Sequence, residues 1–222
     1  MYIVAVIPAY NEESRVGGVV RCVKKYVREV IVVDDGSRDA TAEMARKEGA
    51  RVICHKENSG AGAATMTGLE AARRLGANVV VTLDADEQHD VGDIPALLGP
   101  IERGEADIVF ANRFGRKNHI PFIRRLFNGL GNIVTFMATG RWIADSQCGF
   151  KAFGEKALAE IQLRMSGFEF CTEIVRETAR YRWRIGEVPI KVVYSEYTLA
   201  KGQSFAHGVR TACKILLRSF LR

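Results

Sequence analysis

Short runs of β-branched and other apolar residues alternate with longer amphipathic segments along the first half of the chain. Five of these runs predict strands, at residues 3–7, 30–33, 52–54, 79–83 and 107–111. Apolar residues spaced three or four apart predict the helices between them, at residues 13–26, 41–47, 63–75 and 93–103. Asp93 is the expected N-cap of the last helix. Because continuous apolar strands separated by helices are typical of sheets covered on both faces, we expect an α/β fold with a mostly parallel sheet flanked by helices.

The second half of the chain is richer in helices. Apolar spacing predicts helices at residues 122–137, 168–181 and 204–221, and an apolar run predicts one more strand at 188–194. We find neither an internal repeat nor a low-complexity linker, so residues 1–222 are interpreted as a single domain. It is divided into a strand-rich half, a helix-rich half and a C-terminal helix, at residues 1–111, 112–202 and 203–222.

The C-terminal segment 203–222 is predicted to be a basic amphipathic helix. Apolar side chains recur on one face and basic ones on the other: Phe205, Val209, Ala212, Leu216 and Phe220 against Arg210, Lys214, Arg218 and Arg222. Such a helix suits the interface of an anionic membrane. The alternative is that its apolar face packs against the sheet while its basic face meets water.

Composition places the chain among globular proteins. It has 222 residues, 47% of them hydrophobic, which excludes a disordered chain. Five scattered cysteines without a CxxC pair argue against a zinc ribbon and fit a reducing compartment. The longest uncharged stretch, residues 126–140, is shorter than the roughly 20 apolar residues of a membrane span. We recognise no signal peptide either, so we expect a cytoplasmic protein, soluble or peripheral on a membrane.

The net charge of +6 is concentrated in two regions. Residues 108–144 contain six basic residues and no acidic one, and residues 197–222 contain five basic residues and no acidic one. Such local positive fields suit phosphates, nucleic acids or anionic membranes. Nucleic acid is disfavoured because the basic regions lack interleaved aromatic residues in a recognisable nucleic-acid-binding pattern.

Polar clusters directly follow four of the predicted strands. They lie at residues 8–13, 34–39, 58–64 and 84–89. Each alone is accounted for by a turn with helix caps. Because ligands of open α/β sheets bind beyond the carboxyl ends of the strands, the four together predict a ligand site at one edge of the sheet.

Asp84 and Asp86 form the sharpest of these clusters. Two carboxylates two residues apart after a buried strand can converge on one hard cation, and Gln88 adds a neutral oxygen. Mg²⁺ and Mn²⁺ take such ligands together with substrate phosphate oxygens. The alternative is an aspartate-rich turn without a metal. His89 is interpreted as a hydrogen-bonded or solvated side chain rather than a ligand.

The glycine-rich segment 58–64 opens a predicted helix, and its backbone N–H groups suit an anion. A dinucleotide fingerprint would have a third glycine where Thr65 stands, and it would follow the first strand, so a dehydrogenase is disfavoured. Alternatively, Gly60 and Gly62 only allow close packing of the helix on the sheet.

Together these motifs resemble those of inverting glycosyltransferases with the GT-A fold, a Rossmann-like architecture. The likeness is carried by Ile-Pro-Ala-Tyr-Asn-Glu-Glu at 7–13, Val-Val-Asp-Asp-Gly-Ser-Arg-Asp at 32–39 and Asp-Ala-Asp-Glu-Gln-His at 84–89. Counterparts at residues 112–113, 145–151 and 201–204 extend it over nearly the whole chain. The likeness is strongest to the dolichyl-phosphate mannose synthases and the dolichyl-phosphate glucosyltransferases.

The resemblance implies roles for individual residues. In the half at 1–111 it implies a nucleotide-sugar pocket made by Pro8, Tyr10, Glu12 and Asp35. It implies a Mg²⁺ or Mn²⁺ site at Asp84, Asp86 and Gln88. In the acceptor-binding half at 112–202 it implies that Arg113 and Arg124 receive the acceptor phosphate and, with Asp86, serve catalysis. The resemblance also places Lys201 in the donor site. The family usually has arginine at this position, and lysine cannot make the two parallel hydrogen bonds to one anion that arginine makes.

The implied activity is transfer of a hexose, with inversion at C1, from GDP-mannose or UDP-glucose to a polyprenyl phosphate such as dolichyl phosphate. A phosphate acceptor is already anionic, whereas a hydroxyl acceptor needs a carboxylate base to take its proton. An enzyme that glycosylates a hydroxyl of a polysaccharide or glycan is the alternative, as is a non-catalytic nucleotide-sugar-binding module. Asp145 and Glu173 either orient sugar hydroxyls or support the structure. A lipid acceptor implies a peripheral protein on the cytoplasmic face of a membrane, alone or with a membrane-protein partner.

Overall fold

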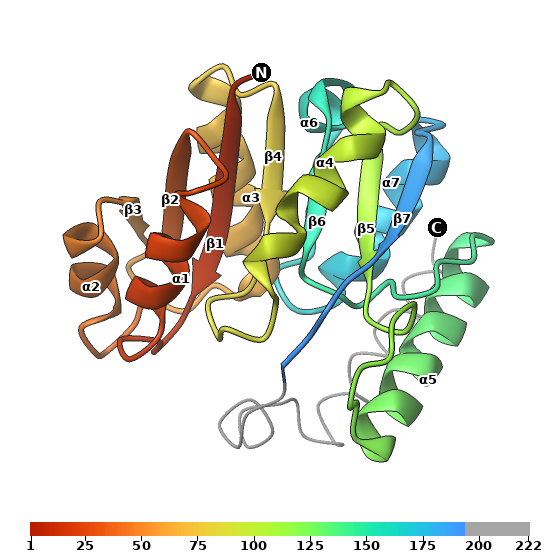
Figure 1. Ribbon diagram of the computed structural model, residues 1–222, viewed down its shortest axis with the longest axis horizontal. Helices are drawn as coiled ribbons and strands as arrows, with labels where there is room; N and C mark the ends of the chain where they lie inside the picture. The colour runs from red at the N-terminus through yellow and green to blue at the C-terminus, as the bar shows by residue number, and fades with distance from the viewer. Residues whose placement is uncertain (194–222) are drawn as a thin grey trace.

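Seven strands form one sheet in the computed structural model, which describes residues 1–193. The strands are β1 (Ile3–Ala9), β2 (Glu29–Asp34), β3 (Arg51–Cys54), β4 (Val79–Thr82), β5 (Ile108–Asn112), β6 (Lys151–Phe153) and β7 (Ile185–Pro189). Their order across the sheet is β3-β2-β1-β4-β6-β5-β7 (Figure 1). Strand β6 runs antiparallel to both of its neighbours, and every other pairing is parallel. The predicted mostly parallel α/β sheet is therefore confirmed.

Helices cover both faces of the sheet (Figure 1). They are α1 (Val16–Val23), α2 (Thr41–Lys47), α3 (Ala61–Arg74), the short 3₁₀ helix η1 (Val91–Asp93), α4 (Ile94–Glu102), α5 (Phe122–Thr139), α6 (Glu155–Glu160) and α7 (Phe170–Arg180). Apolar side chains of α1, α2 and α4 form one buried cluster with the sheet. Those of α3, α6 and α7 form a second cluster on the opposite face. Two apolar layers thus enclose strands whose side chains are buried on both sides, as the continuous apolar runs indicate.

The structure differs from the sequence prediction at several elements. The predicted strand at 188–194 is shorter and begins earlier, at Ile185–Pro189. Strand β6 and helix α6 were not predicted, because a strand of three residues that begins with the buried Lys151 carries no apolar period. Asp93 lies at the predicted helix start but makes no capping bond. Its carboxylate instead accepts hydrogen bonds from Arg116 Nη1 and the Lys191 N–H, at 3.0 and 2.7 Å.

Strands β1, β2 and β4 end at the same edge of the sheet, which we call the carboxyl edge. Ala9, the last residue of β1, pairs with Asp34, the last residue of β2. Thr82 at the end of β4 pairs with Val6 of β1. Because the polar clusters follow these residues directly, the register brings three of them to the carboxyl edge, as the sequence predicted.

Helix α5 lies beyond the carboxyl end of β5, away from the sheet, and contacts α7 (Figure 1). Its outer face carries seven large exposed apolar side chains: Phe122, Ile123, Leu126, Leu130, Ile133, Phe136 and Met137. Phe122 alone exposes 79% of its surface. Over residues 1–193, no helix has the length and apolar character needed to cross a bilayer. The predicted amphipathic helix at 203–222 lies outside the described residues.

Candidate active site

The loop after β4 brings Asp84 and Asp86 together at the carboxyl edge. The Asp84 side chain remains 44% exposed, while Asp86 is half-buried and accepts a hydrogen bond from the Gln88 N–H at 3.0 Å. Burial, and next the negative charge of Asp84, raise the pKa of Asp86 above its ordinary value. Glu87, directly after Asp86, has a left-handed backbone with φ of 61°, which non-glycine residues rarely adopt. The charge of Asp84 therefore lies close enough to disfavour the charged form of Asp86.

The carboxylate of Asp84 lies directly against the backbone of Gly149. A methyl group at Gly149 would overlap both oxygens of Asp84, lying 2.6 Å from Oδ2. The Gly149 carbonyl accepts a hydrogen bond from Thr82 Oγ1 at 2.8 Å, which ties this turn to β4. Only glycine leaves room here for the carboxylate, and the sequence alone did not indicate that the two residues meet.

A divalent cation fits this loop. Within residues 1–193 no three His, Cys, Asp or Glu side chains already form a metal cluster, so the chain offers two carboxylates and the neighbouring Gln88 amide. That small set suits Mg²⁺ or Mn²⁺, which complete their shells with water and substrate phosphates, and it does not suit structural zinc. Burial, and next the charge of Asp84, raise the pKa of Asp86, and a positive charge bound beside both carboxylates would favour their charged forms.

His89 is buried behind Asp84. Its Nε2 lies 3.5 Å from Cys148 Sγ, and its ring lies 5.3 Å from the ring of Phe150, tilted by 34°. Its Nδ1 lies 3.9 Å from Asp84 Oδ2 and has no hydrogen-bond partner among the described residues. Burial lowers the pKa of His89, and it raises the pKa of Cys148 to about 12, so both groups are neutral near pH 7. The contact with Cys148 agrees with the prediction of a hydrogen-bonded histidine.

The loops after β1 and β2 are joined by hydrogen bonds. Asn11, whose φ of 53° is left-handed, donates its N–H to Ser37 Oγ at 2.9 Å. The N–H of buried Glu12 donates to Thr41 Oγ1 at 2.7 Å. Tyr10 is 38% exposed at the mouth of these loops. Of the predicted nucleotide residues, Tyr10 and Glu12 therefore lie on the same loop, with Tyr10 exposed and Glu12 buried.

Pro8 and Asp35 complete the predicted nucleotide set. Pro8 lies within β1 opposite Val33 of β2. The buried Asp35 carboxylate accepts the N–H groups of Ser59 and Gly60, at 2.9 and 2.7 Å. It also lies 2.7 Å from His55 Nδ1. Asp35 thus ties the glycine-rich segment to β2, and its contact with a nucleotide base stays a prediction.

Arg113 is bound to Asp145. Arg113 Nε and Nη2 donate to the two oxygens of Asp145, both at 2.7 Å, and the Arg113 N–H donates to Oδ2 at 3.0 Å. Asp145 is fully buried and Arg113 is 8% exposed. Of the two roles left open for Asp145, the structure favours support. Glu173 also supports the structure, because its Oε2 accepts the N–H groups of Arg164 and Met165.

The described residues include one of the other two predicted cations. Arg124 is half-buried in the first turn of α5, two residues after the exposed Phe122. Lys201 lies outside the described residues. The role of both in the site stays a prediction.

Comparison with known proteins decides the family. Residues 4–162 match Glycosyl transferase family 2. The chain belongs to this family. Its sheet order and antiparallel β6 occur in a GT-A-like fold, so the resemblance stated from the motifs is confirmed.

Several relatives of this family 2 glycosyltransferase act on polyprenyl phosphates. It is 33% identical to a UDP-N-acetylglucosamine–dolichyl-phosphate N-acetylglucosaminyltransferase of Methanococcus voltae, with 96% of this chain and 94% of the relative covered. It is 29% identical to a polyprenol monophosphomannose synthase of Mycolicibacterium smegmatis, with 88% and 79% covered. A glucosyl-3-phosphoglycerate synthase of Mycobacterium tuberculosis, solved with Mn²⁺, UDP-glucose and phosphoglyceric acid, shares the fold. Its TM-score is 0.75 and its identity 20%, over 99% of this chain and 78% of that one.

A buried polar network joins α5 of this family 2 glycosyltransferase to the turn that carries Asp145. Asn132 Oδ1 accepts the N–H and the hydroxyl of Ser146, at 3.0 and 2.8 Å. Asn132 Nδ2 donates to the Ala144 carbonyl at 2.6 Å. Thr135 Oγ1 lies 2.9 Å from Thr172 Oγ1 of α7. The helix is therefore fixed to the site by polar groups on its inner face, while its outer face stays apolar.

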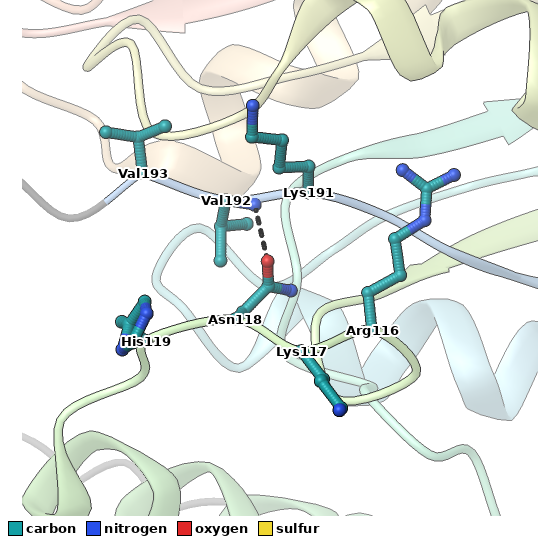
Figure 2. A pocket seen from close by; sticks show the side chains of 7 residues that line it. All are labelled: Arg116, Lys117, Asn118, His119, Lys191, Val192 and Val193. Atoms are coloured by element: carbon teal, nitrogen blue, oxygen red, sulfur yellow. Dashed lines mark hydrogen bonds between the residues drawn. The ribbon is translucent and has the colours of Figure 1, made fainter.

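A groove of about 620 Å³ lies beside the loop after β4 (Figure 2). It is lined by Arg116, Lys117, Asn118, His119, Lys191, Val192 and Val193. Asn118 Oδ1 accepts the Val192 N–H at 3.2 Å, which holds its two walls together (Figure 2). The Val193 N–H donates to the Gln88 carbonyl at 3.0 Å, so one wall continues into the candidate cation loop.

Proposed function

We propose that this glycosyltransferase transfers a sugar from a nucleoside-diphosphate sugar to the phosphate of a polyprenyl phosphate, with inversion at C1. An acceptor phosphate oxygen attacks C1, the bond from C1 to the diphosphate oxygen breaks, and the nucleoside diphosphate leaves. The products are a polyprenyl phosphosugar and the nucleoside diphosphate. No enzyme-bound covalent intermediate is needed, because positioning and electrostatic stabilisation provide the rate.

The proposal of a phosphate acceptor rests on the hydrogen-bond partners of the carboxylates in the acceptor-binding half. A hydroxyl acceptor requires a general base within hydrogen-bond reach. Both oxygens of Asp145 are bound by Arg113, and Oε2 of Glu173 accepts two backbone N–H groups, so both carboxylates make structural contacts in place of a contact expected of a base. The region 108–144, with six basic residues and no acidic one, suits a second anion beside the diphosphate.

Asp84, Asp86 and Gln88 would hold Mg²⁺ or Mn²⁺. When bound, the cation neutralises the charge that develops on the departing diphosphate. The rest of the donor site is assigned to Pro8, Tyr10, Glu12, Asp35 and Lys201. Tyr10 would pack against the base, and Asp35 would accept from its N–H groups. Arg113 and Arg124 would receive the acceptor phosphate, with Asp145 fixing the plane of the Arg113 guanidinium.

A lipid acceptor implies that the enzyme acts at the cytoplasmic face of a membrane. The exposed apolar face of α5 supports a peripheral position, because an amphipathic helix with basic residues at its start suits an anionic interface. Arg124 and Arg125 provide those residues. A membrane-protein partner is the alternative means of presenting the lipid.

The sugar is proposed as a hexose from GDP-mannose or UDP-glucose. The segment Asp-Ser-Gln-Cys-Gly-Phe-Lys at 145–151 resembles the glucosyltransferase branch. The relative of Methanococcus voltae is named for UDP-N-acetylglucosamine, so this donor belongs in any test.

The test is a transfer assay with a donor panel and a matched pair of acceptors. The purified protein is incubated with Mg²⁺ or Mn²⁺, with labelled GDP-mannose, UDP-glucose or UDP-N-acetylglucosamine, and with either a short polyprenyl phosphate or the matching polyprenol. Label is counted in the organic phase. We expect transfer to the phosphate only, from one donor. Asp86→Asn should lower it by on the order of a hundredfold or more.

Glu70→Gln on the outer face of α3 is the matched control, since Glu70 is exposed and pairs with exposed Arg74 on the same helix. It should leave transfer unchanged. Label in the polyprenol, or transfer only to a soluble hydroxyl acceptor such as 3-phosphoglycerate, would contradict the proposal. So would a product that keeps the donor's anomeric configuration.

A further inference from the structure

His89 has one ring nitrogen with a partner and one without. Nε2 contacts Cys148 Sγ at 3.5 Å, and the side chain is 1% exposed. Nδ1 has no hydrogen-bond partner among the described residues, and it faces Asp84 Oδ2 at 3.9 Å. A buried polar atom without a partner is uncommon and calls for an explanation.

The ring is held in place on two sides. Its backbone pairs with Val192 as an isolated β-bridge, and the flanking Asp90 N–H donates to the Lys191 carbonyl at 3.3 Å. The ring packs against Phe150. The backbone pairing and the contact with Phe150 hold the ring in the orientation that directs Nδ1 at Asp84.

The surroundings decide which nitrogen carries the hydrogen. A lone pair on Nδ1 would face a carboxylate oxygen and be repelled by it, whereas an N–H there is attracted. The thiol of Cys148 can donate to a lone pair on Nε2. Both contacts therefore favour the tautomer with its hydrogen on Nδ1.

We infer that His89 is a positioning residue whose Nδ1–H fixes Asp84 Oδ2, so that Oδ1 is the oxygen presented to a divalent cation. On its other side, the Asp84 carboxylate lies against the backbone of Gly149, which limits its movement away from His89. The inference rests on the proposed function, because it takes Asp84 as a cation ligand. It assigns His89 a place behind the ligand and not among the ligands.

Two substitutions separate the two ring nitrogens. In His89→Asn the side-chain amide reaches the level of Nδ1 and keeps a donor toward Asp84. In His89→Gln the amide reaches the level of Nε2 and keeps only the contact with Cys148. Mn²⁺ is titrated into each purified protein without nucleotide, and free Mn²⁺ is read by electron paramagnetic resonance. We expect His89→Gln to weaken Mn²⁺ binding about tenfold or more, and His89→Asn to stay close to wild type.

Melting temperatures of both variants are measured alongside. Equal losses of Mn²⁺ affinity in the two variants, or losses that follow the melting temperatures, would overturn the inference and leave a structural histidine. Asp84→Asn tests the proposed function separately. If Asp84→Asn binds Mn²⁺ like wild type, the proposed cation site is wrong and the inference fails with it. If Asp84→Asn loses Mn²⁺ binding but the two His89 variants bind Mn²⁺ equally well, the proposed cation site is supported and the inference about His89 is wrong.

A measurement on the wild-type protein does not depend on how the variants fold. ¹⁵N chemical shifts of the His89 ring report its tautomer directly. We expect the hydrogen on Nδ1 and a shift of the Nδ1 resonance when Mg²⁺ is added. A ring with its hydrogen on Nε2 would overturn the inference.

Discussion

The guanidinium of Arg113 holds the carboxylate of Asp145 through two parallel hydrogen bonds, both of 2.7 Å, with Asp145 fully buried. The two residues are 32 positions apart: Arg113 directly follows β5, and Asp145 lies in the segment before β6. A planar fork matched to a carboxylate is the geometry that arginine provides and lysine does not. The pair fixes the orientation of a cation assigned to the acceptor phosphate.

Removing one partner of this pair should destabilise the protein. Asp145→Ala leaves a buried guanidinium without its counter-charge, which costs about 3–5 kcal/mol in the free energy of unfolding. Urea unfolding followed by circular dichroism measures it. Glu105→Gln, which breaks the exposed pair with Arg103, is the control and should leave the midpoint unchanged. Equal urea midpoints for Asp145→Ala and wild type would show that the buried pair does not contribute to the free energy of unfolding.

Gly149→Ala should impair the cation site more than it impairs the fold. The added methyl group overlaps the Asp84 carboxylate and forces it away from its present position. We expect Mn²⁺ affinity and sugar transfer to fall by about tenfold or more. Gly129→Ala is the matched control, because a methyl group there meets nothing within 4 Å and favours the helix. Unchanged Mn²⁺ affinity in Gly149→Ala would mean that Asp84 does not depend on this turn.

The outer face of α5 should bind membranes. Phe122 and Leu126 expose 79% and 59% of their surface, and burying such side chains is favourable by about 1.5–3 kcal/mol each. The double substitution Phe122→Ser, Leu126→Ser should therefore lower binding to anionic liposomes by about tenfold or more, measured by flotation. Tyr26→Ser removes an exposed apolar side chain outside α5 and should have no effect.

The C-terminal segment gives a separate liposome test. Binding should fall as salt is added, because basic residues attract anionic headgroups, and it should fall when residues 205–222 are deleted. Binding that is absent at every salt concentration would contradict a peripheral position.

Asp86→Asn should stabilise the protein near neutral pH while it abolishes transfer. Burial, and next Asp84, raise the pKa of Asp86 in the folded state, so the folded state binds the proton more tightly than the unfolded state. Stability therefore falls as pH rises through the raised pKa, and the substitution removes this loss. The melting temperature of Asp86→Asn should exceed that of wild type at about pH 8 with a chelator present, and the difference should shrink toward about pH 4.

Adding Mn²⁺ reverses the order, because a cation bound only by the folded state stabilises it. The wild-type melting temperature should rise with Mn²⁺, and that of Asp86→Asn should not. A difference that grows toward acid pH would contradict the assigned pKa direction.

Local sequence patterns were sufficient to predict which polar residues of the candidate site lie close together. Asp84, Asp86 and Gln88 lie in one short segment after an apolar strand, so their proximity follows from chain connectivity alone. The meeting of this cluster with Tyr10 and Asp35 follows from a parallel sheet, since the carboxyl ends of neighbouring parallel strands share an edge. Periodicity therefore predicted both the sheet and the edge at which these polar clusters lie.

Contacts between distant segments were beyond those patterns. Asp35 with His55, Asp145 with Arg113, and Cys148 with His89 are separated by 20, 32 and 59 positions. The sequence around each of these residues does not indicate which distant residue it contacts, because such contacts depend on how the helices and strands pack together. The antiparallel insertion of β6 between β4 and β5 is what brings Gly149 against Asp84 and Cys148 against His89. The sequence by itself indicated which polar groups are candidates for the chemistry, and long-range packing decided how they are oriented, because orientation arises only when segments far apart in the chain are held against one another.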